Sequence, residues 1–196
     1  MQIIRQSEFS ASAWKNGGGI THEAIRVPPG GDRFLWRVSV AHIESAGPFS
    51  DFSGYRRFMV LLRGAGMRLA FGNGARHTLR CAGELVEFDG AMAAQCELFS
   101  GPCVDFNFIV AKSLHVIDAG VRRLTGTLAP ISHPGNSLVV FPVDGPLMVQ
   151  TSGAESAMLE PWDLAVIPQA SAEPVVVAPL QQDAAPQVFL ASFGYS

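Results

Sequence analysis

Short apolar segments, broken repeatedly by turn-forming residues, are the feature that most limits what this chain can fold into. The segments are rich in Val, Ile, Phe and Leu, and Gly, Pro or Asp soon interrupts each of them. Such segments are typical of β-strands joined by tight turns, and few are long enough to form an amphipathic helix. The sequence therefore predicts an all-β protein.

The expected strands form two sets with a weakly patterned connection between them. The first set covers Ile20 to Arg26, Phe34 to Ile43, Phe58 to Leu62, Met67 to Phe71, Leu85 to Phe88, Ala94 to Phe99 and Val104 to Val110. The second set covers Leu138 to Phe141, Leu147 to Thr151, Leu164 to Ile167, Val175 to Ala178 and Val188 to Phe193. The connection, Lys112 to Pro134, contains one further candidate strand at Val121 to Leu128.

The second set repeats the first at a nearly constant offset. Ser137 to Phe141 aligns with Phe58 to Leu62, a shift of 137 − 58 = 79 residues, and the same shift places Gly145 on Gly66. Identity between the halves is low, so an internal duplication, which we favour, stands beside the ordinary periodicity of strands as an explanation.

Duplicated sets of short antiparallel strands with Gly-rich turns suit a double-sheet jelly roll. Leu159 to Pro168 forms a tight turn leading into a strand that ends at Pro, as in cupin barrels, and its counterpart is Leu79 to Phe88. We predict a bicupin, with two cupin-like jelly-roll barrels in one compact chain. Residues 1–111 are expected to form an N-terminal barrel with the ligand site, and residues 112–196 a degenerate C-terminal barrel.

The charge balance argues against nucleic acid or membrane partners. Lys and Arg number 14 and Asp and Glu 17, so the formal net charge is −3, and neither sign forms a run. The longest apolar stretches fall well short of the roughly 18 residues that a spanning helix needs. The N-terminus lacks the apolar core of a secretory signal, and the three cysteines show no CxxC spacing. We therefore expect a cytoplasmic protein in which Cys81, Cys96 and Cys103 are reduced core residues.

The histidines do not show the spacing of a cupin metal site, which needs a His-x-His pair, a carboxylate and a later His. The five residues are His22, His42, His77, His115 and His133. No expected strand carries two of them at positions i and i+2. The fold could gather distant ligands, but we predict ordinary surface or hydrogen-bonded histidines, no metal and no cofactor.

The most unusual local sequence is Trp14 to Glu23, which contains three consecutive glycines. Ordering three Gly is costly, so left-handed dihedrals or a close backbone approach are expected here. A phosphate loop would need a preceding strand and a following Lys-Ser/Thr, and both are missing. A hairpin turn and a ligand-contacting loop remain as alternatives. The loop Ala46 to Arg57, rich in aromatics, is likewise either a packed surface loop or a pocket wall.

Strand alternation places several polar residues on one face. In Trp36 to Ala41, Arg37 and Ser39 lie opposite the apolar residues, and in Val104 to Val110, Asp105 and Asn107 do the same. Together with Arg57 they could converge inside a barrel. A buried Arg needs an anion, so either Asp105 neutralises it as a structural ion pair, or Asp105 positions it for a ligand carboxylate. In the second half, the strand equivalent to Asp105 to Asn107 lies at or beside Gln187 to Phe189, where the acid and the amide are lost.

Recognisable catalytic motifs are missing. No GxSxG nucleophile elbow occurs, and neither the cysteines nor the carboxylate pair Glu84 and Glu87 has a pattern specific for catalysis.

Five motifs resemble the HutD/Ves family. They are Trp14-x-Asn16-Gly-Gly-Gly19-x-Thr21-x-Glu23, Trp36-Arg37-x-Ser39, Gly47-Pro-Phe-Ser50, Gly54-Tyr-x-Arg57 and Gly101-Pro-x-x-Asp105-Phe-Asn107. They run in the family's order over residues 14–107, whereas the second half resembles the family only in its strand pattern and in the segment Val139 to Gly145. The intact glycine run and the Gly-Pro-Phe-Ser motif favour the HutD branch.

The resemblance implies a metal-free bacterial bicupin, encoded with histidine-utilisation enzymes in the HutD branch or linked to stress responses in the Ves branch. It implies a regulatory protein that binds a small molecule, with urocanate or formylglutamate as candidate ligands. Both are carboxylates, which agrees with the expected arginines. The motifs and the strand alternation together give nine candidate ligand-binding residues: Trp14, Asn16, Glu23, Trp36, Arg37, Ser39, Arg57, Asp105 and Asn107.

Three functions remain at this stage. The first, which we favour, is a binding or regulatory protein that captures a small anionic metabolite. The second is a metal-independent cupin-type enzyme acting on a pathway intermediate. The third is a scaffold for a histidine-pathway enzyme. A homodimer is compatible with the sequence.

Overall fold

The computed structural model describes the chain except residues 126–128, 132–136, 154, 169–173, 182–183 and 196. It divides the described chain into two compact units, residues 9–113 and residues 1–8 with 114–196. The regular secondary structure of the described residues consists of strands joined by turns and loops, apart from one 3₁₀ turn, η1 (Gln6–Glu8). No helix in the described part is long and apolar enough to cross a membrane.

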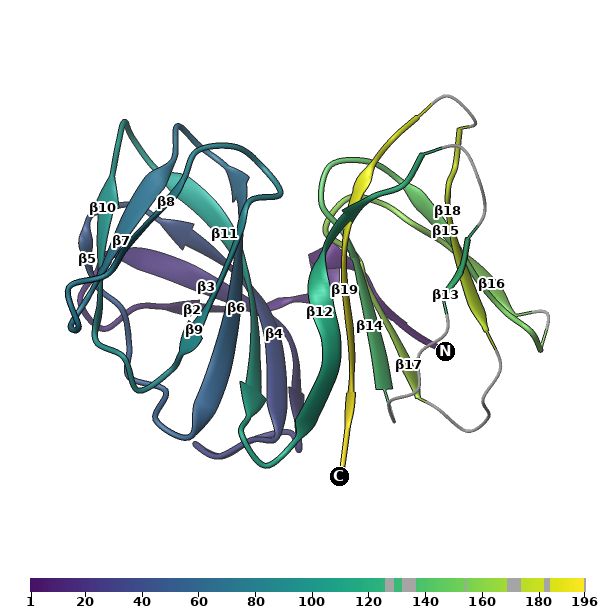
Figure 1. Cartoon of the computed structure of the whole chain (residues 1–196), viewed down its shortest axis with the longest axis horizontal. Coiled ribbons are helices and arrows are strands. Elements are labelled where there is room, and N and C mark those ends of the chain that lie inside the picture. Colours follow the sequence, from purple (N-terminus) through teal and green to yellow (C-terminus); the bar gives the residue numbers. More distant parts are fainter. Residues whose placement is uncertain (126–128, 132–136, 154, 169–173, 182–183, 196) are drawn as a thin grey trace. The chain divides into compact units, whose positions relative to one another are not determined.

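The unit of residues 9–113 is built from two antiparallel sheets (Figure 1). The larger has the order β2 (Ser10–Ala13), β3 (Gly19–Val27), β4 (Trp36–Ile43), β11 (Cys103–Ala111), β6 (Tyr55–Arg63), β9 (Leu85–Asp89). The smaller has the order β5 (Gly47–Pro48), β10 (Ala94–Leu98), β7 (Met67–Phe71), β8 (Arg76–Leu79). Side chains of both sheets, such as Leu61 and Leu69, share one buried core, which makes the unit a barrel.

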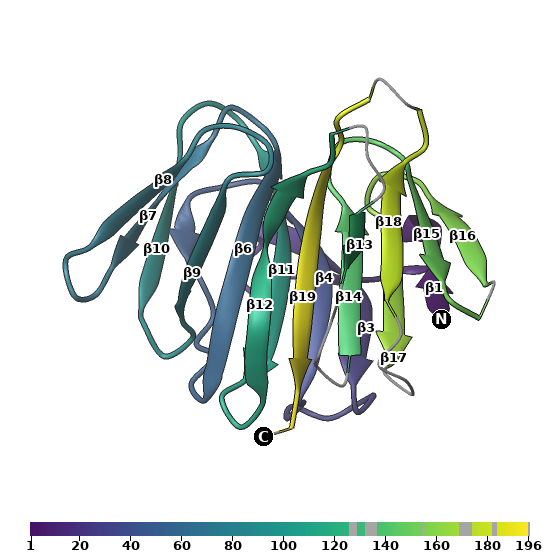
Figure 2. The ribbon, with the colours of Figure 1, turned by 45° about the vertical axis from the view of Figure 1, so that its right-hand side comes forward.

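The second unit also has two sheets, whose strands are seen side by side in Figures 1 and 2. The larger has the order β1 (Gln2–Ile4), β17 (Leu164–Pro168), β14 (Ser137–Pro142), β19 (Gln187–Gly194), β12 (His115–Arg123). The smaller has the order β13 (Ala129–Ile131), β18 (Val175–Pro179), β15 (Leu147–Thr151), β16 (Ser156–Leu159). Their shared core, which includes Val140, Val149 and Leu190, is apolar.

The two units repeat one topology. The order β4-β11-β6-β9 matches β12-β19-β14-β17, and β5-β10-β7-β8 matches β13-β18-β15-β16. The repeat begins earlier than the sequence indicated, because β12 starts 115 − 36 = 79 residues after β4. The weakly patterned connection expected from residue 112 is therefore wrong, since it contains this strand of nine residues. The expected strand at 121–128 begins inside β12, and its residues 126–128 lie outside the described residues.

The expected domain limits need two corrections. Residues 1–8 belong to the second unit and not to the N-terminal barrel, because β1 pairs antiparallel with β17. Buried Asp163 reinforces this pairing: Arg5 Nη1 donates to its Oδ2 at 2.7 Å, and the backbone N–H of Gln6 donates to its Oδ1 at 2.9 Å. The boundary between the units lies at 113/114 rather than 111/112.

The cysteines are all free, but they do not all lie in the core. Cys96 and Cys103 are buried, whereas Cys81 is exposed. The expectation for Cys81 was wrong because it lies in the turn between β8 and β9 rather than on a strand.

Candidate functional site

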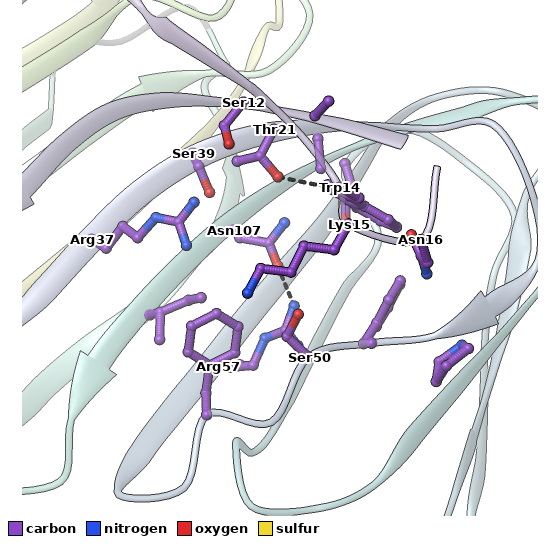
Figure 3. Close-up of a pocket in the computed structure, with 17 residues that line it drawn as sticks. Ser12, Trp14, Lys15, Asn16, Thr21, Arg37, Ser39, Ser50, Arg57 and Asn107 are labelled. Atoms are coloured by element: carbon purple, nitrogen blue, oxygen red, sulfur yellow. Dashed lines mark hydrogen bonds between the residues drawn. The ribbon is translucent and has the colours of Figure 1, made fainter. Parts of the chain in front are cut away.

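A cavity of about 490 Å³ lies within the unit of residues 9–113 (Figure 3). Its walls come from β2, β3, β4, β5, β6 and β11, from the loop between β2 and β3, and from the loop that follows β5. The lining residues are Ser12, Ala13, Trp14, Lys15, Asn16, Thr21, Arg37, Ser39, Ala41, Pro48, Phe49, Ser50, Phe52, Arg57, Asp105, Asn107 and Ile109.

Most of the residues expected from the sequence line this cavity. They are Trp14, Asn16, Arg37, Ser39, Arg57, Asp105 and Asn107. Glu23 is not among the lining residues, but it contacts Arg37 from behind. The prediction that Trp36 lies in the binding site needs correction. Trp36 does not line the cavity and is buried on the opposite face of β4, together with Val38 and Val40. The family motif included it, whereas strand alternation alone had already placed it on the other face.

Three neighbouring strands bring the polar residues together. In the pairing of β4 with β11, Ser39 lies opposite Asn107 and Ala41 opposite Asp105. Ile109 pairs with Arg37 on one side and with Arg57 on the other. Because all these residues occupy positions of the same parity, their side chains share the face inside the barrel. The expected convergence is confirmed.

Arg57 is the most deeply placed cation, with 5% of its surface exposed. Its Nη2 donates to Asn107 Oδ1 at 2.8 Å, while its Nε has no hydrogen-bond partner in the described structure. The rings of Phe49, Phe52 and Phe88 surround the guanidinium, with centroids at 5.4, 5.2 and 4.9 Å from Cζ. Burial lowers the pKa of Arg57 to about 10, so the group stays charged at neutral pH.

Asp105 lies beside Arg57 and is 1% exposed. The described structure has no ion pair within 4.0 Å between these two side chains, and the Nη2 of Arg57 donates to Asn107. The Oδ1 atom of Asp105 has no hydrogen-bond partner in the described structure. Burial raises the pKa of Asp105 to about 7, although Arg57, Asn107 and nearby backbone groups act in the opposite direction. A close structural ion pair is therefore not what holds Arg57 in place.

Arg37 is held by a carboxylate that two arginines share. Its Nε lies 2.7 Å from Glu23 Oε2, and Arg26 donates to the same oxygen through Nη2 at 2.8 Å. The contact to Arg37 is an ion pair without hydrogen-bond alignment, since Arg37 Nε makes no hydrogen bond. Desolvation raises the pKa of Glu23, but Arg26 and Arg37 together outweigh it and lower the pKa. Glu23 thus stays ionised and positions Arg37, whose guanidinium points into the cavity in Figure 3.

The glycine-rich loop forms one rim of the cavity. Trp14 Nε1 donates to Thr21 Oγ1 at 2.8 Å, and the backbone of Gly18 donates to Asn16 Oδ1 at 3.0 Å. Gly17 has a left-handed φ of 71°. A Cβ on Gly19 would lie 2.4 Å from the backbone oxygen of His42. Both expected reasons for the glycine run are therefore present.

Replacing Gly19 with Ala should disturb this rim. The added methyl group collides with backbone rather than with a movable side chain, so we expect a loss of about 1–3 kcal/mol in the free energy of unfolding. Gly47→Ala is the control, because a Cβ there meets nothing within 4 Å. Thermal unfolding checks the difference, and equal stability of the two variants would contradict it.

Sequence reasoning missed Lys15, Ser12 and Ala13. Lys15 sits within the conspicuous Trp14 motif, and its side chain extends from the loop into the cavity (Figure 3). Ser12 and Ala13 belong to β2, a four-residue edge strand with no apolar alternation that could have revealed it. Phe49 and Phe52 lie in the loop Ala46 to Arg57 and line the cavity, so this loop forms a pocket wall, one of its two predicted roles.

Among the described residues, the second unit does not repeat the acid and amide pair of Asp105 and Asn107. With Ser137 equivalent to Phe58, the pairing of β14 with β19 places Leu190 at the position of Asp105 and Ser192 at that of Asn107. The strand equivalent to Asp105–Asn107 is thus Leu190–Ser192, next to the expected Gln187–Phe189. Among the described residues, no group of three or more His, Cys, Asp or Glu gathers as metal ligands. His133 lies outside the described residues.

A family model described as HutD matches residues 6–184. The chain belongs to the HutD family. The match extends through most of the second half, where the resemblance rested on the strand pattern and on the segment Val139 to Gly145. A relative described as an uncharacterized 21.2 kDa protein in the hutC 3′ region of Pseudomonas putida is 33% identical over 165 residues, which cover 83% of this chain and 84% of that protein. This genomic setting associates the HutD family with histidine utilisation.

Solved structures agree with the HutD assignment and with the fold. A conserved protein of unknown function from Pseudomonas aeruginosa PAO1 has a TM-score of 0.86 and 26% identity, covering 98% of both chains. HutD from Pseudomonas fluorescens SBW25 has a TM-score of 0.80 and 26% identity, covering 100% of this chain and 98% of that one. An oxalate decarboxylase from Lactobacillus farciminis reaches 0.71 at 9% identity, covering 98% and 86%, which shows the cupin fold alone. The predicted bicupin is confirmed.

Proposed function

We propose that this HutD family protein binds a small carboxylate metabolite of histidine breakdown and acts as a cytoplasmic binding or regulatory protein. The observation that carries the proposal is Arg57: a charged guanidinium, almost fully buried, whose Nε lacks a partner and which lines a cavity. Burying a charge without an anion is unfavourable, so the site favours a ligand that brings one. A carboxylate can accept two guanidinium hydrogen bonds at once.

The rest of the cavity supports a small organic anion. Arg37 and Lys15 add positive charge, while Trp14, Phe49 and Phe52 supply apolar walls. A volume of about 490 Å³ falls within the range of small-molecule sites. Urocanate and formylglutamate, the candidates that the family resemblance implies, are both carboxylates of a size that such a cavity admits.

A thermal-shift screen of histidine-pathway intermediates tests this function. A ligand at 100 times its dissociation constant stabilises the folded protein by about 2.7 kcal/mol, which is readily detected. We expect at least one carboxylate intermediate to raise the melting temperature, and neutral analogues of the same shape to have no effect. If none of the pathway carboxylates shifts the melting temperature or binds in calorimetry, the proposal is wrong.

Binding should not depend on a metal. The histidines lack a metal-ligand spacing in the sequence, and the cavity is lined by cations and neutral groups apart from Asp105. We therefore expect prior treatment with EDTA to leave the ligand-induced thermal shift unchanged. A shift that disappears with EDTA and returns on adding zinc, iron or manganese would contradict this expectation.

One observation favours a second candidate, a metal-independent enzyme. Asp105 has a pKa of about 7, which suits a general acid or base at neutral pH, and it lines the cavity. Proton NMR of each candidate intermediate incubated with the protein would show turnover directly. Saturable binding without any product favours the binding protein, whereas product formation that Asp105→Asn abolishes would favour the enzyme.

A further inference from the structure

Asp105 has an environment that suits a neutral carboxyl group as well as a charged one. Its side chain is buried at the wall of the cavity, and its Oδ1 makes no hydrogen bond in the described structure. An ionised carboxylate normally accepts hydrogen bonds at both oxygens, and burying it without them is unfavourable. The nearest stabilising charge is that of Arg57, whose Nη2 donates to Asn107 rather than to Asp105.

We propose that Asp105 takes up a proton when a carboxylate binds to Arg57, so that this pocket binds its ligand together with a proton. The inference rests on the proposed function and adds a condition on it: affinity for the carboxylate falls as the pH rises above neutrality. Asp105 would then be a residue that tunes specificity, because it selects ligands that tolerate, or accept a hydrogen bond from, a neutral carboxyl group.

The groups that face Asp105 decide how it titrates. The positive charge of Arg57 on β6 lowers the pKa of Asp105. The charge of Arg37 on β4 repels that of Arg57 and lowers the pKa of Arg57. Cys96 on β10 and Cys103 on β11 interact with it, but burial raises the pKa of Cys96 to about 12 and also raises that of Cys103, so both thiols remain neutral. Lys15 lines the same cavity from the loop. Arg57 is thus the positive charge on which ionised Asp105 depends most.

A bound carboxylate would compete for that charge. Two carboxylates beside one guanidinium repel each other, and the buried one is the harder to keep ionised. The pKa of Asp105, about 7 in the empty pocket, therefore rises when the ligand binds. Above pH 7 the empty pocket holds mainly ionised Asp105 and the filled pocket mainly protonated Asp105. About half a proton is taken up per binding event at pH 7 and nearly one at pH 8, so the affinity falls by a factor that approaches ten for each pH unit above 8 and levels off below pH 7.

Calorimetry at pH 8 in two buffers of different ionisation enthalpy measures the proton directly. The probe is N-formyl-L-glutamate, whose carboxylates stay ionised from pH 6 to 8.5. We expect the wild type to take up close to one proton at pH 8 and its dissociation constant to rise about fivefold from pH 7 to pH 8. Asp105→Asn, which is isosteric and cannot titrate, should bind without proton uptake and with a nearly constant affinity. His42→Gln, whose ring lies near His22 at the other face of β4, should behave as wild type.

The results distinguish a failure of carboxylate binding from a failure of proton uptake by Asp105. If neither the wild type nor Asp105→Asn binds the probe at any pH, the proposed function fails for this ligand class and the proton linkage fails with it. If both bind with the same pH dependence, the proton linkage alone is overturned and carboxylate binding stands.

A measurement without ligand keeps the proposal independent of the probe. Burial raises the pKa of Asp105 above its unfolded value, so the protonated form stabilises the fold at low pH and this contribution is lost as the pH rises from about 4 to 7. The melting temperature of the wild type should therefore fall relative to that of Asp105→Asn across this window and stay parallel above it. Parallel curves throughout would show that Asp105 does not titrate near neutrality, which would overturn the proposal.

Discussion

Replacing Arg57 with Met is expected to remove carboxylate binding while leaving the protein folded. A buried guanidinium contact to a carboxylate is worth about 2–5 kcal/mol, so affinity should fall by a factor of about 30 to several thousand. Isothermal calorimetry with the ligand found in the thermal-shift screen measures this loss. Arg57 has this weight because it lines the cavity and its buried Nε has no hydrogen-bond partner in the described structure.

The fold should tolerate the change because two unfavourable features disappear together. Met fills a similar volume, and its thioether packs well against the rings of Phe49, Phe52 and Phe88 that surround the guanidinium. Without Arg57, burial keeps Asp105 protonated, so no uncompensated charge remains in the barrel. Replacing a buried charge by an apolar residue is often nearly neutral, and we expect the free energy of unfolding to change by about 1 kcal/mol or less.

Arg56→Met is the matched control, since it makes the same substitution one residue earlier on β6. Arg56 is partly exposed, pairs with Glu87 and is not among the cavity residues. Its replacement should leave the affinity unchanged. If Arg57→Met kept the full ligand response, or lost it only because the protein unfolded, Arg57 would be a structural residue and the binding site would lie elsewhere.

The period of a β-strand explains why so much of the site could be predicted. Side chains alternate strictly, so once two strands were recognised, Arg37 and Ser39 had to share one face and Asp105 and Asn107 another, with only the pairing left to add. The pairing itself comes from backbone hydrogen bonds that no side-chain pattern reveals. That Ile109 lies between Arg37 and Arg57 was therefore not predictable.

The elements that the sequence did not predict lack a regular alternation of apolar and polar residues. β12 has no fully buried residue, since its place in the sheet comes from backbone pairing with β19 rather than from a core face. β2 is exposed along its whole length, although Ser12 and Ala13 still reach the cavity. Lys15 lies in a loop, where no periodicity indicates a direction. Applying the repeat offset of 79 residues to β4 would have predicted β12. The two halves keep the same order of strands although few of their side chains are the same.

Replacing Asp163 with Ala is expected to give the largest loss of stability, and it tests the assignment of residues 1–8 to the second unit. The carboxylate is 4% exposed and accepts hydrogen bonds from Arg5, from the backbone of Gln6 and from the backbone of Glu160. The Arg5 side chain is 46% exposed, so water can solvate its charge after the change. The two backbone donors lose a charged acceptor, and we expect the free energy of unfolding to fall by about 2–4 kcal/mol.

The matched control for this change is Asp118→Ala. Asp118 forms an exposed ion pair with Arg122, a contact worth about 1 kcal/mol or less. Thermal and urea unfolding of the full chain measure both variants. Because Arg5 and Asp163 act through one contact, Arg5→Ala should cost less in the Asp163→Ala background than in the wild type. Additive effects, or a loss no larger than that of Asp118→Ala, would show that β1 is held by its pairing with β17 alone, and that the buried carboxylate does not secure the N-terminal strand.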